Sequence, residues 1–163
     1  MHSFAKRGLA AAMCAGMVIS LVSGCGKKDD SAAEAAVAVK VNEQTVDENV
    51  AKFIVRYEQA KFESTSGQFL QMFGYTDYWL MDMYGTGQPY SDLFKENQEQ
   101  NIQRMLLASE AAADLGIALT DEQKSGIAEA AKAFIDGNDQ EVLDKMGATQ
   151  ETVEQALTLY AVQ

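Results

Sequence analysis

Large apolar side chains are concentrated in one short stretch of this 163-residue chain. They lie between Gln68 and Tyr90, beside a glycine-rich loop, GTGQP, that holds the single Pro of the sequence. Met and aromatic side chains form adaptable surfaces that bind varied apolar partners. The same residues could instead pack against a neighbouring helix as core. The candidate residues for binding an extended peptide are Phe69, Met72, Phe73, Tyr75, Tyr78, Trp79, Met81, Met83 and Tyr84.

Cys25 is a candidate site of lipid attachment. Two basic residues at positions 6–7 precede an apolar run over 9–22, which is typical of a secretory signal peptide and short for a membrane span. The run ends in Val-Ser-Gly-Cys at 22–25, which resembles the lipobox of bacterial lipoproteins. The resemblance implies cleavage between Gly24 and Cys25 and attachment of lipid to the Cys25 sulfur. The alternative is an ordinary secretory signal with a chance Cys.

Lipid attachment at Cys25 predicts where the chain resides. Acylation of the new amino terminus would add to the lipid on the sulfur, and two or three chains anchor a protein stably where one does not. We therefore expect a signal peptide over 1–24, a small polar tether over 25–36, and a domain over 37–163. The domain would lie on the extracytoplasmic face of the cell membrane and touch the membrane through its lipid anchor only.

Residue types exclude several classes of active site. His2 and Cys14 fall within the expected signal peptide, and lipidation consumes Cys25, so Ser/His, Cys/His and His-based metal sites are excluded from the processed chain. The segment 136–141 has only a partial likeness to a calcium loop, because suitable ligands are missing at the later positions. The sequence therefore predicts no catalytic residue, no metal and no cofactor.

The charge balance limits the partners. The chain has 13 basic and 24 acidic residues; without Lys6 and Arg7 the remainder has 11 basic and 24 acidic residues, a net charge of −13. Phosphate contacts need Lys and Arg, so nucleic acid is excluded as a partner. Most of the acidity is explained by solubility of a helical surface, although it could also attract basic partners.

A helix predicted over 91–115 is the longest element and organises the others. The stretch has neither Pro nor Gly, and its apolar residues recur at spacings of three and four. Ser91 is predicted to cap its start, and Gly116 to end it in the left-handed conformation. A lone helix of this kind is unstable in water, so its apolar face needs partners. The predicted inward positions are Leu93, Phe94, Ile102, Met105, Leu106, Ala112 and Ala113.

Shorter elements flank this helix. The β-branched run at 37–41 predicts a strand whose partner we expect elsewhere in the chain. Asp47 is predicted to open a helix that ends at 64–67, with one or two short helices following, broken near Gly74. After the long helix, Thr120 and Gln123 have capping-box spacing. Three further helices are predicted after Thr120, after Asn138 and after Thr149.

The layout of these elements resembles the N-terminal, peptide-binding domain of the SurA/PrsA type of extracytoplasmic chaperone and peptidyl-prolyl isomerase. The resemblance rests on the opening VAVKVNEQTVDENV, the long helix ending in Leu115-Gly116, the connector IALTDEQ and the short helices through 149–160. It implies a mainly α fold, built around one long helix with a short N-terminal β-strand. Glu43 departs from the family, where Gly is common. The isomerase domain that follows in the family is missing, and we expect the parent protein to continue beyond Gln163.

The resemblance implies a chaperone-like domain that binds unfolded or extended segments of exported proteins. Two alternatives stay open. The chain could be the N-terminal part of a peptidyl-prolyl cis-trans isomerase whose catalytic domain is absent here, or a structural or adaptor lipoprotein without a client. Enzymatic activity of the chain alone is not expected.

Overall fold

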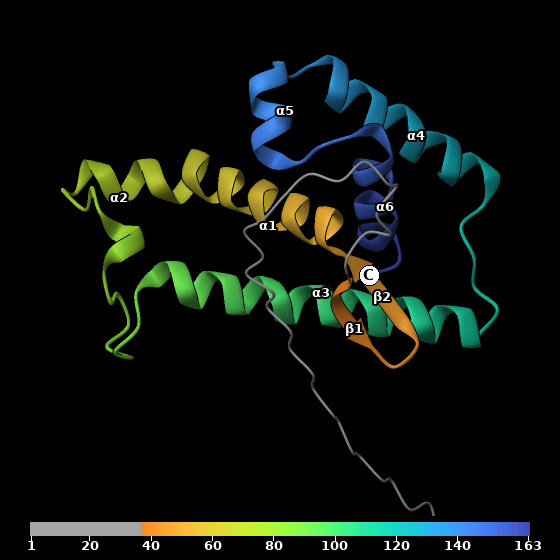
Figure 1. Cartoon of the computed structure of the whole chain (residues 1–163), viewed down its shortest axis with the longest axis horizontal. Helices are drawn as coiled ribbons and strands as arrows, with labels where there is room; N and C mark the ends of the chain where they lie inside the picture. Colours follow the sequence, from red (N-terminus) through yellow and green to blue (C-terminus); the bar gives the residue numbers. More distant parts are fainter. Residues whose placement is uncertain (1–36) are drawn as a thin grey trace, which may run out of the picture.

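A computed structural model describes residues 37–163 of the protein. The expected signal peptide, the lipidation site Cys25 and the tether over 25–36 lie outside the described residues. Within the described residues the fold is mainly α with a small N-terminal sheet, as the sequence predicts (Figure 1). In chain order the elements are β1 (Val37–Val41), β2 (Gln44–Asp47), α1 (Glu48–Phe62), the π-helix η1 (Glu63–Gly67), α2 (Gln68–Met72), the 3-10 helix η2 (Tyr78–Leu80), α3 (Tyr90–Asp114), α4 (Asp121–Asp136), α5 (Gln140–Met146) and α6 (Gln150–Ala161).

The predicted strand is correct, but its partner is not distant. β1 pairs antiparallel with β2, which follows it after a two-residue turn. Asn42 in this turn has a φ of +53°, a conformation that Asn tolerates better than most residues and that tight hairpins require. Val46 on β2 is buried, so the hairpin is held against the helices by its apolar side. The Asn42 amide also donates a hydrogen bond of 2.7 Å to the Glu110 carboxylate of α3.

The first helix extends further than predicted. Asp47 caps α1 by accepting from the Val50 N–H at 2.9 Å, as expected. The prediction that the helix ends at 64–67 is wrong, because the chain passes through the π-helical turn η1 and continues into α2. The hydroxyls of Ser64 and Thr65 donate to the Lys61 carbonyl at 2.9 and 2.8 Å. The two hydroxyls thus find a hydrogen-bond acceptor within the helix itself. Polar residues that usually end helices are therefore accommodated in the wider π-helical turn.

The long helix α3 is confirmed, although its start differs from the prediction. Pro89 stands at the N-cap position with no side-chain cap, and Ser91 lies within the first turn. The fixed φ of Pro is compatible with this position, and Pro has no N–H that would need a partner. The end is as predicted: Gly116 has a φ of +70°, and the Ile117 N–H donates to the Ala112 carbonyl at 2.8 Å. This closing pattern satisfies carbonyl groups that the helix end would leave free.

The last three helices are also found where the sequence predicts them. Thr120 and Gln123 form the capping box of α4, and Thr149 caps α6 by accepting from the Thr152 N–H. One detail is wrong: Asn138 does not cap α5. Its amide donates instead to the Phe134 carbonyl at 2.7 Å, so it finishes α4 rather than starting the next helix.

The main core lies where the hairpin, the first half of α1, the second half of α3 and α6 meet. α6 contacts α1, α3 and α4, so the C-terminal helices close over the core on one side of the α1–α3 pair (Figure 1). The α1–η1–α2 rod extends from this core over the first half of α3, and residues 73–89 join the two at the far end. The most buried core residues are Val46, Val50, Phe53, Ile54, Ile102, Leu106, Ala131, Val153 and Ala156.

A polar contact joins the C-terminal helix to α1. The Tyr160 hydroxyl donates a hydrogen bond of 2.8 Å to the Glu58 carboxylate, across more than a hundred residues of sequence. Burial and the adjacent Glu58 raise the pKa of Tyr160 above its ordinary value, so the hydroxyl stays protonated and keeps its donor role at neutral pH. Lys61 pairs with the same carboxylate at 3.0 Å.

Replacing Ile102 with Ala should lower the free energy of unfolding by about 2–5 kcal/mol, because it leaves a cavity in the core. The Ile102 side chain is only 1% exposed. Leu107→Ala, further along the same helix, is the matched control, because Leu107 is 48% exposed and should lose less than about 0.5 kcal/mol. Urea titration of both variants measures the difference. Equal losses would contradict the placement of the α3 core face.

Candidate functional site

An aromatic cluster joins the far end of α1 to the start of α3. The Phe62 ring, on the last residue of α1, lies 5.8 Å from Tyr78, 5.4 Å from Trp79, 5.3 Å from Tyr90 and 6.2 Å from Phe94 between ring centroids. Such separations are those of interacting aromatic pairs. The cluster therefore forms a second packing centre, apart from the main core, where α1, η2 and α3 meet.

Gly67 lets the Tyr78 ring enter this cluster. Tyr78 is only 3% exposed, and a Cβ at position 67 would lie 2.6 Å from the Tyr78 hydroxyl oxygen. Gly67 has helical backbone angles, so its role is to leave space and not to provide a turn. Burial raises the pKa of the Tyr78 hydroxyl, and the negative charge of Glu63 acts in the same direction.

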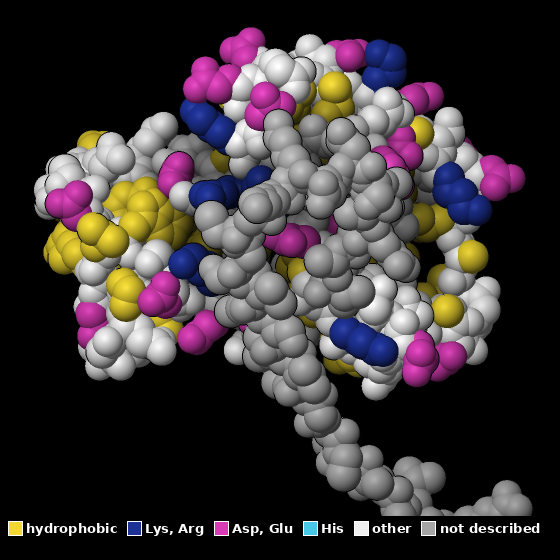
Figure 2. All heavy atoms as spheres, viewed as in Figure 1, with side chains coloured by type: hydrophobic (Ala, Val, Ile, Leu, Met, Phe, Trp, Pro, Cys, Tyr) yellow, Lys and Arg dark blue, Asp and Glu magenta, His cyan; other side chains and the backbone are white. Residues whose placement is uncertain are grey.

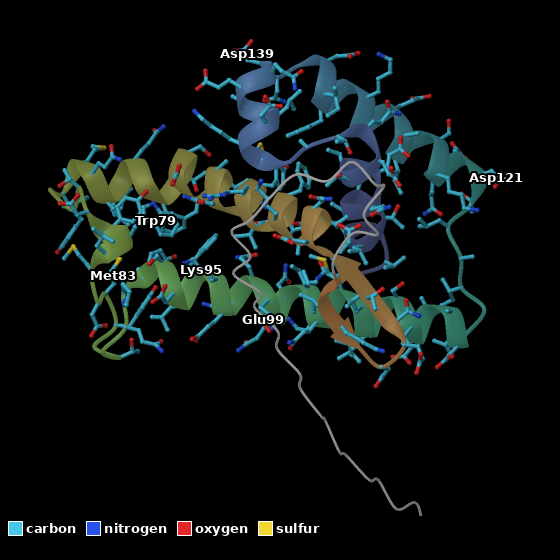
Figure 3. The ribbon with its side chains drawn as sticks, viewed as in Figure 1. Trp79, Met83, Lys95, Glu99, Asp121 and Asp139 are labelled. Carbon is cyan, nitrogen blue, oxygen red and sulfur yellow. The ribbon has the colours of Figure 1, made fainter. Side chains whose placement is uncertain are left out.

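Trp79 is held by stacking and by one hydrogen bond. Its ring stacks on Tyr90 with a centroid separation of 5.3 Å and an interplanar angle of 19°, and it meets Phe94 edge-on at 5.2 Å. The indole N–H donates to Glu63 Oε1 at 3.0 Å, so a carboxylate on η1 orients the ring. Trp79 and Met83 lie at the same end of the molecule, opposite to Asp121 (Figure 3). The indole is therefore a reporter of this end.

Large apolar side chains around the buried cluster are exposed. Met72 is 84% exposed and Leu80 77%, far more than side chains of a packed core. Figure 2 shows hydrophobic side chains gathered at the end of the molecule formed by α2 and the 73–89 segment. We call this set the distal apolar surface; its members are Phe69, Met72, Phe73, Tyr75, Leu80, Met81 and Tyr84.

A groove opens beside this surface. It has a volume of about 440 Å³ and lies between the rod and the segment that returns to α3. Its walls are mostly apolar, with hydroxyl groups from η1 at one side. It is lined by Phe62, Thr65, Ser66, Phe69, Leu70, Met83, Tyr84 and Tyr90.

Asp82 organises the loop that carries Met83 and Tyr84. Its two carboxylate oxygens accept from the Gly87 N–H at 2.7 Å and the Thr86 N–H at 2.9 Å. These two bonds, Gly87 first, hold the pKa of Asp82 below its ordinary value, so the residue is ionised at neutral pH. The loop therefore has a defined shape although it is exposed.

The structure divides the candidate residues predicted from sequence into two groups. Tyr78 is buried and Trp79 half-buried, so neither lies on the open surface; they support it from beneath. Met83 is half-buried and lines the groove. The exposed group is Phe69, Met72, Phe73, Tyr75, Met81 and Tyr84.

The candidate set predicted from sequence omitted residues that build the site. Phe62 and Phe94 lie outside the Met- and aromatic-rich stretch but fill the centre of the cluster. Their positions on the apolar faces of α1 and α3 were the available signal. Leu80 lies within the stretch but is not among the predicted candidates, yet it is among the most exposed apolar residues. Nothing local marks Glu63 or Gly67, because their roles depend on residues that meet them only in the folded chain.

The described residues contain neither a candidate metal site nor a candidate membrane-spanning helix. Within 37–163 there is no group of three or more His, Cys, Asp or Glu that could hold a metal ion. The segment 136–141 is occupied by the end of α4 and the start of α5. A second hollow, between the start of α1, α5 and α6, has mixed polar and apolar walls. None of the described helices is long and apolar enough to cross a bilayer.

Comparison with protein-family profiles, with curated proteins and with solved structures gives no match for this chain.

Gly67→Ala should destabilise the protein by about 1–3 kcal/mol, because the new Cβ would overlap the Tyr78 hydroxyl. Gly126→Ala in α4 is the control: nothing lies within 4 Å of its added Cβ, and Ala is favoured over Gly in a helix by about 0.5–1 kcal/mol. Urea titration gives both values, and Trp79 emission should shift only in the first variant.

Adding Tyr78→Phe to Gly67→Ala should recover stability, since the next ring atom, Cζ, is 3.4 Å from the added Cβ. The double-mutant cycle isolates this contact. Equal behaviour of Gly67→Ala and Gly126→Ala would show that the buried placement of Tyr78 is wrong.

Proposed function

We propose that the protein is a lipid-anchored, extracytoplasmic, chaperone-like domain that binds unfolded or extended segments of exported proteins. The binding residues are those of the distal apolar surface and the groove beside it. The observation that carries the proposal is the exposure of these large apolar side chains on a well-packed base. Exposed apolar patches of this kind mark interaction sites in soluble proteins.

The nature of the side chains supports a varied set of clients. Exposed Met72 and Met81 are flexible and polarizable, and they can repack against different apolar groups. The groove, at about 440 Å³, is within the size range of pockets that bind small ligands or single anchoring side chains. Since a chaperone must release its client, we expect dissociation constants in the micromolar range, about −8 kcal/mol of binding free energy.

The sequence supports the proposed location. A basic segment, an apolar run and the lipobox-like Val22-Ser23-Gly24-Cys25 are together typical of an anchored lipoprotein. Anchoring would place the domain where exported chains emerge unfolded. The resemblance to the SurA/PrsA type of chaperone, which rests on sequence alone, favours the same function. The alternatives remain the N-terminal part of an isomerase, or a structural or adaptor lipoprotein.

The variant Phe69→Ser with Met72→Ser should weaken binding of an unfolded client at least about tenfold, because it removes two exposed apolar contacts. The measurement is titration with a reduced and alkylated, permanently unfolded protein, followed by Trp79 emission and by suppression of client aggregation. Leu115→Ser with Ile117→Ser is the matched control: these residues are similarly exposed but lie at the other end of α3 (Figure 1).

The control variant should bind as the unaltered protein does. If no client changes Trp79 emission or aggregation, the chaperone proposal is wrong, and a structural or adaptor lipoprotein becomes the better account.

Cys25→Ser should move the protein from the membrane fraction to the soluble fraction and remove the mass added by lipid. The physical reason is that the sulfur is the proposed point of attachment and stable anchoring needs its acyl chains. Cys14→Ser is the control, since Cys14 falls within the segment expected to be removed. Cell fractionation and intact-mass analysis measure both effects. Continued membrane association of Cys25→Ser at unchanged mass would contradict lipidation.

A further inference from the structure

The part of the chain that forms the distal end carries charged residues of one sign only. Residues 62–94 contain no Lys, Arg or His, but they contain four acidic residues, Glu63, Asp77, Asp82 and Asp92. The nine Lys and Arg residues of the described chain, which are the 13 of the full sequence less Lys6, Arg7, Lys27 and Lys28, all lie outside this range. The distal apolar surface is therefore built in a segment that supplies negative charge alone.

The basic residues that flank this segment are already paired. Lys61 contacts the Glu58 carboxylate at 3.0 Å, and Lys95 contacts Asp92 at 3.4 Å. Neither Lys neutralises the negative charge of Glu63, Asp77 or Asp82, the three acidic residues nearest to the distal apolar surface. Figure 2 shows acidic side chains at the border of the hydrophobic group on the visible face.

Three acidic residues lie beside the apolar residues of this end, and hydrogen bonds fix the carboxylates of two of them. Glu63 follows Phe62 of the groove wall and is fixed by hydrogen bonds from Trp79 at 3.0 Å and Gln59 at 2.8 Å. Asp82 lies between Met81 and Met83 in the chain, and its carboxylate is fixed by the loop backbone. Asp77 is exposed and immediately precedes the buried Tyr78.

This charge pattern selects among possible occupants of the surface. Anionic lipid would be repelled by it, and so would an acidic peptide. A second copy of the chain would bring its own acidic border against this one, which disfavours self-association through this surface. An apolar segment with Lys or Arg beside it is complementary, because long basic side chains lay their methylene groups on apolar surface while their charge reaches a nearby carboxylate.

We propose that the distal apolar surface binds apolar peptide segments that carry Lys or Arg next to the apolar run, with the basic groups received by Glu63, Asp77 and Asp82. This inference rests on the proposed function and specifies its class of client. The apolar contacts provide most of the affinity, and the acidic residues favour peptides whose flanking residues are Lys or Arg.

The test uses three synthetic peptides with one shared apolar core and two flanking residues on each side, either Lys, Ser or Glu. Binding to the purified protein is followed by Trp79 emission and calorimetry. At about 0.01 M salt the Lys-flanked peptide should bind at least about tenfold more tightly than the Glu-flanked peptide. At about 1 M salt the three affinities should converge, because screening shortens the reach of the charges to about 3 Å.

A charge-neutral variant, Glu63→Gln with Asp77→Asn, should lose most of the preference for Lys flanks. The amide introduced by Glu63→Gln would keep an oxygen acceptor for the Trp79 N–H, and no side-chain hydrogen bond of Asp77 is found within the described residues. Asp114→Asn with Glu122→Gln removes the same number of charges far from this surface, at the end of α3 and in the first turn of α4, and should keep the preference. Asp82 is left unchanged because it shapes the loop.

Each outcome separates the two proposals. Equal binding of Lys- and Glu-flanked peptides would overturn this inference and leave the proposed function standing. Absence of binding by every peptide and by unfolded clients would overturn both. Dimerisation of the protein that is abolished by Phe69→Ser with Met72→Ser, measured by analytical ultracentrifugation, would show that a second copy occupies the surface and would also overturn the inference.

Discussion

The packing of Phe62 against the start of α3 is the interaction on which the candidate site depends. All buried residues of α1 lie in its first half, up to Ile54, so the main core holds only one end of this helix. The other end extends past the core, and Phe62 fastens it through ring contacts with η2 and with Tyr90 and Phe94 of α3. This second packing centre therefore links the far end of α1 to the first turns of α3.

The aromatic cluster explains how so much apolar surface can stay exposed. A folded protein cannot bury every large side chain, but a contiguous exposed group needs a rigid base if it is not to collapse inward. Tyr78 provides that base by entering the space above Gly67, and Trp79 is oriented by Glu63. The π-helical turn η1 belongs to the same arrangement, since both Glu63 and Gly67 are among its residues. Such turns occur frequently at functional sites.

Charge and apolar exposure act together at this end of the molecule. Like charges on the distal segment repel each other between copies, so we expect them to oppose self-association through the exposed apolar surface. In the proposed client-binding role, the same charges would restrict which apolar partners approach and would give an otherwise adaptable surface some selectivity. Because the long-range part of this effect is screened by salt, its strength depends on ionic conditions outside the molecule.

The local signals in the sequence predicted most of the helices. Caps at Asp47, Thr120 and Thr149, the left-handed Gly116 and the apolar period of α3 all act within four or five residues, so they can be read without knowing the fold. The mainly α class followed from them. The same local rules failed at 64–67, where hydroxyls bond to an earlier carbonyl and the helix does not end, and at Asn138, whose amide bonds to an earlier carbonyl and does not cap α5. They also failed at Ser91, because Pro89 takes the N-cap position of α3.

Composition also located the candidate site, because Met and aromatic residues gather in one stretch whatever their packing. Only the tertiary structure decided which of them are buried. Tyr78 and Met72 have similar sequence surroundings, yet one is 3% and the other 84% exposed. Burial depends on Phe62, Gly67 and Phe94, which approach from other elements. The sequence by itself therefore determined the helices and the chemical character of the candidate site, whereas long-range packing decided which side chains are buried beneath the surface and which are exposed on it.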